Sequence, residues 1–436
     1  GTTFVNVEGK NISITGADSI LGEKGNANSL GGKAMGGAVK AEVKDKADMT
    51  VFGNMEDGET KISARNLALT SRGDIKTGTF TGSDKLSLYN AGKVSGGTFR
   101  GGEVGLTNGG TLSGGSFTAG GNMTMVNRKD GVMDSGFFAG KDLTFNNEGK
   151  AAGGTYKADE SMNLANSGTL KKSTFESGGP LDMANSGTVS RSSLISGRVL
   201  TYGDTKTGAI MASSLTSKAG KVILGGASPL LGRVENVSIS AVHDIAMNAK
   251  SDLTLTSVKG STVSLTTGGN LTVDKAETTD GDLTMEADGK HTAATLTSTS
   301  GLTAKSGTDM EVENLSAGDA AELTAKESLS LTKGSASSLT MKSGKGMTVG
   351  EAETTDGDLA MEAGGKLTAK TLTSASGLKA KSGSDMEVER FNAWEKAELS
   401  STDNIRLKEG RAGDLSMDAG KNISVEDKLQ ARMGSA

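Results

Sequence analysis

Apolar and polar residues alternate over short stretches along most of the chain, and these stretches return at a nearly constant spacing. Alternation with a period of two over two to four residues predicts β-strands rather than helices. Between residues 80 and 195 the clearest marker is an aromatic position, which returns after steps of 19, 18, 20, 19 and 19 residues and ends in a leucine after 19 more. The marker residues are Phe80, Phe99, Phe117, Phe137, Tyr156, Phe175 and Leu194.

Each repeat also carries an alternating apolar pair and, five residues before the aromatic, a third apolar position. The pairs are Leu86/Leu88, Val104/Leu106, Met123/Met125, Leu143/Phe145, Met162/Leu164 and Leu181/Met183, and the third positions are Val94, Leu112, Val132, Ala151, Leu170 and Val189. One such unit cannot bury its inner face alone, but stacking places each strand beside its copy in the next unit, roughly 4.8 Å away. The pattern predicts an all-β fold, a parallel β-helix (β-solenoid) with about 19 residues and three short strands per coil.

An asparagine follows each apolar pair by two residues: Asn90, Asn108, Asn127, Asn147, Asn166 and Asn185. Identical amides stacked at the strand spacing can hydrogen-bond to one another as a ladder, and asparagine tolerates left-handed backbone at a corner. Glycine pairs before the aromatic, such as Gly96-Gly97 before Phe99, predict a tight bend. We expect the aromatic rings to stack at one vertex of the coil, and we interpret both columns as structural.

A longer repeat appears further along the chain. The eight residues from Ala276 to Leu283 recur from Ala352 to Leu359 at an offset of 76, which is four times 19. Before this repeat the spacing of the apolar positions becomes irregular, and Pro229 predicts a register change or an outward loop. The expected segments are N-terminal coils with a glycine-rich excursion near Leu21 to Ala38 (1–61), regular coils (62–215), irregular transition coils (216–270), a first four-coil module (271–346), a second four-coil module (347–422) and a C-terminal tail (423–436).

The composition is typical of a thin solenoid core, and it excludes several classes of function. Only 34% of the 436 residues are hydrophobic and 3% aromatic, while 64 are glycine. A net charge of -5 with scattered Lys and Arg argues against a nucleic-acid partner. No apolar stretch approaches the roughly 20 residues of a membrane helix, so we expect no stable membrane insertion. The absence of cysteine excludes disulfides and thiolate chemistry, and it suits an exported chain.

Short motifs in the chain resemble the haemagglutinin repeats of filamentous haemagglutinin-type exoproteins. The motifs are Gly-Gly-Asn-Leu-Thr-Val from Gly268, Gly-Asp-Leu-Thr-Met-Glu-Ala-Asp-Gly-Lys from Gly281 and Ala-Gly-Lys-Asn-Ile-Ser-Val from Ala419, and the resemblance runs from about Ile62 to Val425. It implies a right-handed β-helix that an outer-membrane partner transporter secretes to the bacterial cell surface through a region outside this chain. It further implies a monomeric rod, the shaft or binding segment of an adhesin for receptors on host cells, matrix or other bacteria.

Two other functions stay open from sequence. The first is the stalk or receptor-binding part of a contact-dependent growth inhibition effector, although the Val-Glu-Asn-Asn junction of many such proteins is absent: Val234-Glu235-Asn236 continues as Val237. The second is a β-helical polysaccharide-active enzyme, which would need clustered ionisable residues on adjacent coils.

The chemistry that such an enzyme needs is not apparent in the sequence. The two histidines, His243 and His291, lie outside any recognisable catalytic motif, and Leu367 replaces His291 in the second module. The recurring carboxylates Asp280, Asp282, Asp356 and Asp358 have neither calcium-repeat nor EF-hand spacing and are interpreted as corner residues. The chain is therefore predicted not to be an enzyme, with no catalytic, cofactor-binding or metal-binding residues.

One departure from repetition predicts a contact site. Where the first module has Asn314, Leu315 and Gly318, the second has Arg390, Phe391 and Trp394. The single Trp of the chain thus replaces a corner glycine, and exposed Trp and Arg are typical anchors of protein interfaces. We therefore expect a partner-binding site at Arg390, Phe391 and Trp394, against the alternative that Trp394 only packs over a strand edge.

Overall fold

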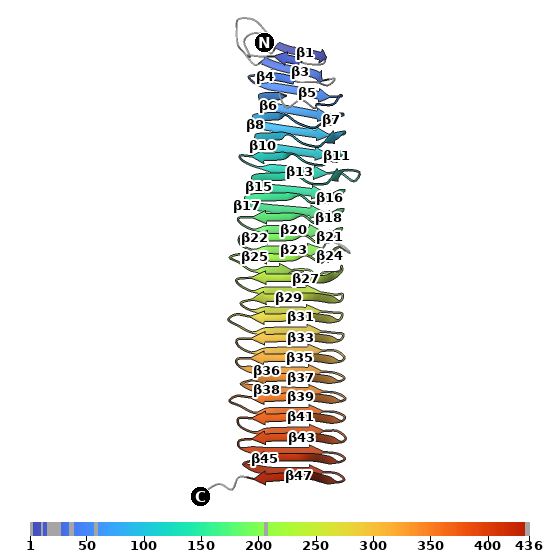
Figure 1. Ribbon diagram of the computed structural model, residues 1–436, viewed down its shortest axis with the longest axis vertical. Coiled ribbons are helices and arrows are strands. Elements are labelled where there is room, and N and C mark those ends of the chain that lie inside the picture. Colours follow the sequence, from blue (N-terminus) through green and yellow to red (C-terminus); the bar gives the residue numbers. More distant parts are fainter. Residues whose placement is uncertain are drawn as a thin grey trace. The chain divides into compact units, whose positions relative to one another are not determined.

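The computed structural model describes residues 3–9, 12–14, 28–34, 39–55, 60–204 and 208–431, with side chains from residue 39 onward. The chain forms two compact units, Gly1–Gly220 and Lys221–Ala436. Within each unit the strands lie parallel, and most pair with a counterpart about 19 residues along the chain (Figure 1). The separation is larger, for example, where Thr3 pairs with Asn28 and where Val222 pairs with Ile245. The described residues contain no helix of the length and hydropathy needed to cross a membrane. The predicted all-β parallel solenoid is confirmed.

Unit 1 is built from long strands that follow two sides of a coil and short strands that form the third side. The first strands are β1 (Thr3–Gly9), β2 (Ile12–Ile14), β3 (Asn28–Ala34), β4 (Val39–Glu42) and β5 (Lys46–Val51). The two-sided strands are β6 (Lys61–Ser71), β8 (Thr79–Asn90), β10 (Thr98–Asn108), β15 (Phe137–Asn147) and β17 (Thr155–Asn166). In other coils these two sides are separate strands: β12 (Ser116–Ala119), β13 (Met123–Asn127), β19 (Thr174–Ser177), β20 (Leu181–Asn185), β22 (Ser193–Ser196), β23 (Leu200–Asp204) and β25 (Ser214–Ser217). The third side holds β7 (Asp74–Ile75), β9 (Lys93–Val94), β11 (Thr111–Leu112), β14 (Val132–Met133), β16 (Lys150–Ala152), β18 (Thr169–Lys171), β21 (Thr188–Ser190) and β24 (Ala209–Met211).

Unit 2 has two strands per coil, because one strand bends over a corner without losing its pairing. In β31, Leu271, Val273, Ala276 and Thr278 are buried, while the two consecutive residues Asp274 and Lys275 face outward at the bend. The predicted three inward segments are therefore present, with two of them joined in one strand. The bent strands are β27 (Val234–Ala241), β29 (Leu253–Gly260), β31 (Leu271–Thr278), β33 (His291–Ser298), β35 (Met310–Ala317), β37 (Leu329–Ala336), β39 (Met347–Thr354), β41 (Leu367–Ser374), β43 (Met386–Ala393), β45 (Ile405–Ala412) and β47 (Ile423–Ala431). The shorter strands are β26 (Val222–Leu224), β28 (Ile245–Ala249), β30 (Val263–Thr267), β32 (Leu283–Ala287), β34 (Leu302–Ser306), β36 (Ala320–Ala325), β38 (Ser338–Ser343), β40 (Leu359–Ala363), β42 (Leu378–Ser382), β44 (Lys396–Ser401) and β46 (Asp414–Ala419).

The aromatic column of unit 1 is a continuous stack of rings, with one correction to its predicted members. Centroids of neighbouring rings lie 4.9, 4.4, 5.1, 4.9 and 4.6 Å apart through Phe80, Phe99, Phe117, Phe138, Tyr156 and Phe175. The predicted member Phe137 is wrong, because Phe138 pairs with Phe117 and is fully buried while Phe137 is 40% exposed.

The same shift affects the third apolar position of that coil. Met133, rather than the predicted Val132, is buried and pairs with Leu112. The shift arises in the turn closed by the bond from the Gly131 amide to the Arg128 carbonyl, which lengthens the coil from Phe117 to Phe138. Because adjacent residues of a strand face opposite sides, an error of one residue exchanges the inner and outer faces.

The predicted asparagine ladder is present and buried. Each side-chain amide nitrogen donates to the amide oxygen of the next asparagine along the chain, at 2.7 to 2.8 Å, from Asn90 through to Asn185. The last amide, that of Asn185, donates to the Tyr202 hydroxyl at 2.8 Å, which ends the ladder. The asparagines are the last residues of their strands and none has a positive φ, so the expectation of left-handed asparagine corners is wrong.

The left-handed corners lie just before the aromatic column instead. Gly97 and Gly115, at φ 96° and 98°, fill the corner in the predicted glycine pairs. Later coils turn one residue earlier, where Lys172 and Arg191 adopt φ 52° and 50°. Left-handed geometry costs a residue with a Cβ about 1 kcal/mol or more. The backbone at Lys172 and Arg191 is therefore strained, and glycine would relieve the strain.

We therefore expect Lys172→Gly to raise the free energy of unfolding by roughly 0.5 to 1 kcal/mol, because glycine adopts the left-handed corner without the Cβ clash. The matched change Gly97→Ala should lower it by about 1 to 2 kcal/mol, since alanine would be forced to φ 96°. Urea unfolding followed by circular dichroism measures both. Equal effects of the two changes would contradict the assignment of strain to these corners.

Two predicted irregularities can be located in part. Residues 226–229, including Pro229, form a loop beyond β26, and the chain returns to the sheet at the bridge of Leu230 with Ala249. Within the glycine-rich stretch from Leu21 to Ala38, Asn28–Ala34 is strand β3, which pairs with β1 and β5. The rest of that stretch lies outside the described residues, as do residues 432–436 of the predicted C-terminal tail.

Candidate functional site

The three residues of the predicted contact site lie on or just after β43 in unit 2, facing different ways. Arg390 points outward, Phe391 points inward and is only 4% exposed, and Trp394 is 65% exposed in the turn after the strand. The Trp394 backbone amide donates to the Ser374 carbonyl at 3.1 Å, so the turn itself is paired with the preceding coil. Arg390 and Phe391 line one hollow, whereas Trp394 lies outside it.

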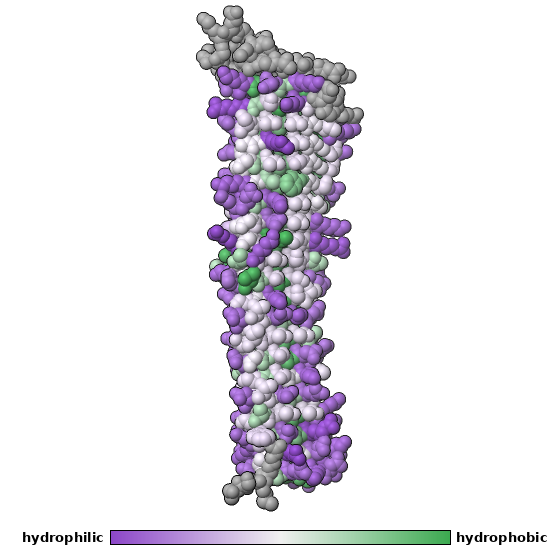
Figure 2. Space-filling model, turned by 60° about the vertical axis from the view of Figure 1, so that its left-hand side comes forward, coloured by the Kyte–Doolittle hydropathy of each residue, from purple (hydrophilic) through white to green (hydrophobic). Residues whose placement is uncertain are grey.

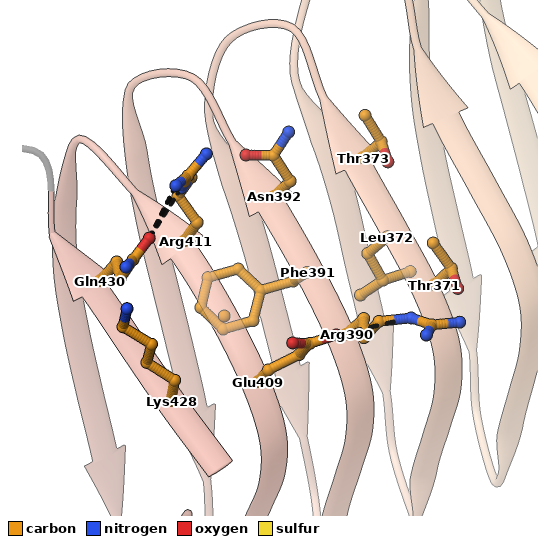
Figure 3. Close-up of a pocket in the computed structure, with 11 residues that line it drawn as sticks. Thr371, Leu372, Thr373, Arg390, Phe391, Asn392, Glu409, Arg411, Lys428 and Gln430 are labelled. Carbon is orange, nitrogen blue, oxygen red and sulfur yellow. Dashed lines mark hydrogen bonds and ion pairs between the residues drawn. The ribbon is translucent and has the colours of Figure 1, made fainter.

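The hollow lies over a place where a large inward side chain packs against a glycine of the next coil. Gly410 of β45 lies in register with Phe391, and a Cβ added at Gly410 would fall 2.0 Å from a ring carbon of Phe391. The bulky ring and the glycine therefore fit only together. The space left open has a volume of about 350 Å³, near the lower end of the roughly 300 to 1,000 Å³ typical of small-molecule sites (Figure 3).

Two rows of outward side chains border this hollow across four neighbouring strands. The rows follow from strand register, which places Thr371, Arg390, Glu409 and Lys428 in one column and Thr373, Asn392, Arg411 and Gln430 in the other. In Figure 3 the Phe391 ring lies between the two rows. The site therefore combines a buried aromatic floor with a rim of hydroxyl, amide and charged groups.

The rim has a surplus of positive charge. Arg390 forms an ion pair with Glu409 at 3.8 Å, and Glu409 is the one carboxylate that lines the hollow. Arg411 donates to the neutral amide oxygen of Gln430 at 2.7 and 3.1 Å. Among the described residues neither Arg411 nor Lys428 has a carboxylate partner. The lining of the hollow thus has three cations and one carboxylate. Hydrophilic side chains also gather on the surface of these C-terminal coils (Figure 2).

The first module has the opposite charge at the equivalent place. Gly334 corresponds to Gly410 and lies in register with Leu315. Lys333 beside it pairs with Glu351 at 3.3 Å, and Glu353 lies in register with Ser335. One cation therefore faces two carboxylates, whereas the second module has three cations and one carboxylate. Both modules have a glycine at this inward position, and the reversal of charge concerns the outward residues beside it.

Among the residues that line the hollow, only Arg390 and Phe391 were predicted from the sequence as part of a site. Glu409, Gly410, Arg411 and Lys428 are among those that were not. Comparison of the two modules pointed to Arg390 and Phe391 because they differ from Asn314 and Leu315. The glycine is shared by the two modules, so it carries no such signal. The available signal was positional, since Gly410 comes 19 residues after Phe391 and therefore lies beside its ring.

A second hollow of about 480 Å³ opens on the neighbouring part of the same strands. Its lining mixes the cations Arg406 and Lys408 with the carboxylates Glu387, Glu389 and Glu426, and Arg406 lies 3.6 Å from Glu387. The cations are thus matched by at least as many carboxylates. This arrangement offers no preference for a ligand of either charge.

The ionisable residues noted in the sequence have structural surroundings. Asp358 accepts hydrogen bonds from the Ser376 hydroxyl at 2.7 Å and the Gly377 amide at 2.8 Å, which lower its pKa and fix the corner of the next coil. His243 is exposed, whereas His291 is fully buried. Burial lowers the pKa of His291 to about 4. Among the described residues no three His, Cys, Asp or Glu side chains are close enough to hold a metal ion.

Comparisons with protein-family models, with curated proteins and with solved structures find no match to this chain. The class of the protein therefore follows from its own architecture. It is a β-helical repeat protein, with parallel strands stacked in coils of about 19 residues.

Proposed function

We propose that this chain is the shaft or binding segment of a secreted filamentous adhesin that attaches a bacterial cell to host cells, matrix or other bacteria. In this proposal an outer-membrane partner transporter exports the protein through a region outside this chain. A receptor on the opposing surface is then contacted by the outward columns of the solenoid. The resemblance of the Gly268, Gly281 and Ala419 motifs to haemagglutinin repeats supports this assignment.

The observation that carries the proposal is that the inward residues of the strands form the core, whereas the outward residues vary from coil to coil. Inward columns are filled by buried apolar residues and by the asparagine ladder, which leaves them no role beyond folding. Outward columns vary between coils that are otherwise copies, as the reversal of charge beside Gly334 and Gly410 illustrates. A fold of this kind supports adhesion because many weak contacts along a repeated surface add up through avidity.

Saturable binding of the labelled, purified chain to host cells, to matrix glycans and to neighbouring bacteria tests the proposal. We expect saturable binding to at least one surface, and the surface chosen separates an adhesin from the stalk of a growth-inhibition effector. Purely linear, non-saturable uptake on all three would refute a recognition role for these coils.

Within the same assay, Trp394→Gly should reduce surface binding about tenfold, because an exposed Trp is a typical interface anchor. The change restores the glycine that the first module has at Gly318, so the free energy of unfolding should shift by less than about 0.5 kcal/mol. Unchanged binding with unchanged stability would remove Trp394 from the contact site.

A further inference from the structure

We infer that the coil around His291 is an acid-operated switch: protonation of this side chain releases the start of β33 from its neighbours, while the matching coil of the second module stays closed. The inference goes beyond the proposed function and holds whether or not the chain is an adhesin. Among the described residues of unit 2, His291 is the only ionisable side chain that is buried, so it departs from the apolar filling of the other coils.

The surroundings of His291 suit a neutral imidazole and not a charged one. The side chain is fully buried, and neither ring nitrogen has a hydrogen-bond partner among the described residues. Its neighbours in register are the apolar side chains of Leu271 and Met310. A cation at this place loses its hydration and gains no compensating contact, so burial lowers the pKa of His291 to about 4. An imidazolium must therefore reach water, which requires the coil to open.

No other ionisable group faces this imidazole. The strand β33 contacts β31, β32, β34 and β35, and the buried residues of these strands are all apolar or carry a hydroxyl. No carboxylate is thus placed inside the coil to stabilise the charged ring. The charged side chains of the same four strands lie on the outer face: Asp274, Lys275, Glu277, Glu286, Lys305, Glu311 and Glu313.

The position of His291 within the coil gives its ring a short path to water. It is the first residue of β33 and follows the turn at residues 288–290. The Lys290 amide donates to the side-chain oxygen of Asn270 at 2.8 Å. The His291 amide donates to the Asp309 carbonyl at 3.0 Å. Release of these bonds frees the corner, and the opening can stay local because each coil of a solenoid contacts only its neighbours.

The second module has the same coil without the imidazole. Leu367 replaces His291, is fully buried and lies in register between Met347 and Met386. A difference in acid response between the two coils therefore reports on His291, because most carboxylates around the coil occur in both modules. The recurring pairs are Asp282 and Asp358, Glu286 and Glu362, Asp309 and Asp385, and Glu311 and Glu387.

Amide hydrogen exchange of the full chain at pH 7.5 and at pH 4.5, corrected for the intrinsic exchange rate at each pH, tests the switch. Below pH 6.5 the opened coil binds a proton that the closed coil excludes. The equilibrium constant for opening of β33 should therefore rise roughly 10- to 100-fold between the two pH values. That of β41 should change by less than about threefold, since it has no such proton to bind. Equal changes in the two strands would overturn the assignment to His291.

Variants at His291 separate the charge of the side chain from its polarity. His291→Leu and His291→Gln both remove the titrating group, so β33 should lose its acid response in each. His291→Gln also keeps a buried polar group, so an acid response that persisted in it would show that polarity, and not protonation, opens the coil.

Two further variants use the other module as a template. Leu367→His should give β41 the acid response of β33, and a β41 that is protected at pH 7.5 but still insensitive to acid would contradict the inference. Asp288→Gly is the matched control, because it copies Gly364 of the second module and removes a carboxylate that only the first module has. It should leave the response of β33 unchanged, and loss of the response would assign it to this carboxylate instead.

A switch must also be local and reversible. The circular dichroism of the chain should change little at pH 4.5, and return to pH 7.5 should restore the initial protection of β33. Loss of the β-sheet signal at pH 4.5, or protection that does not return, would indicate acid denaturation and overturn the switch.

Discussion

Replacing Asn127 by Leu should destabilise unit 1 by about 3 to 5 kcal/mol. The Asn127 amide oxygen accepts from Asn108 at 2.8 Å, and its nitrogen donates to Asn147 at 2.8 Å and to the Lys150 carbonyl at 3.2 Å. Leucine has a similar size but can replace none of these bonds, so buried polar groups on both sides lose a partner. Each such group costs about 1 to 3 kcal/mol.

Amide hydrogen exchange is the suitable measurement for this variant, because a solenoid can open locally without unfolding as a whole. We expect faster exchange in β10, β13 and β15, the strands that carry the broken rungs. Asn163→Leu is the control, since Asn163 is exposed on β17, and it should change stability by less than about 0.5 kcal/mol. Similar exchange in both variants would show that the ladder contributes little to stability.

Replacing His291 by Leu should stabilise unit 2 by about 1 to 3 kcal/mol at neutral pH and by more in acid. His291 lies in register between Leu271 and Met310 and is fully buried. Neither ring nitrogen has a hydrogen-bond partner among the described residues, and an unsatisfied buried polar group is costly. Leu367 fills the equivalent position of the second module, which shows that the coil accepts leucine there.

The pH dependence has a definite sign. Burial lowers the folded-state pKa of His291 from 6.5 to about 4, so between these values the unfolded chain binds the proton and the folded chain does not. Above pH 6.5 this proton has no effect on the free energy of unfolding of unit 2, and as the pH falls towards 4 that free energy decreases by up to about 3 kcal/mol. In His291→Leu this loss should disappear.

Urea unfolding at pH 7.5 and at pH 4.5 measures the effect. Leu367→His is the reciprocal control, because it places the same imidazole in the second module and should add a second acid-dependent loss. The assignment would be wrong if His291→Leu kept the wild-type difference between the two pH values.

The repeat made much of the fold predictable from sequence. A side chain that recurs every 19 residues must face the same way in each coil, so the positions of Phe99 and Asn108 predicted a ring stack and an amide ladder that the structure contains. The register failed at Phe137 and Phe138, where two adjacent aromatic residues fit the pattern equally well. The turn that precedes them decides between the two, and sequence spacing gives no independent measure of its length.

The candidate site was less predictable for a related reason. Phe391 differed from its counterpart Leu315, but the sequence could not show that its ring turns inward against Gly410. The contact between an inward ring and a glycine of the next coil is a property of two neighbouring coils together. The cations Arg411 and Lys428 gain their significance from that geometry, since alone they are ordinary surface charges.

Antibody labelling of intact cells of the producing organism tests the central claim, surface display for attachment, most directly. Antibodies raised against the purified chain should label intact cells as strongly as permeabilised ones, and their monovalent fragments should reduce attachment of the cells to the surface that the purified chain binds. Labelling that requires permeabilisation, or full attachment with every surface epitope occupied, would contradict the assignment of these coils to an adhesin.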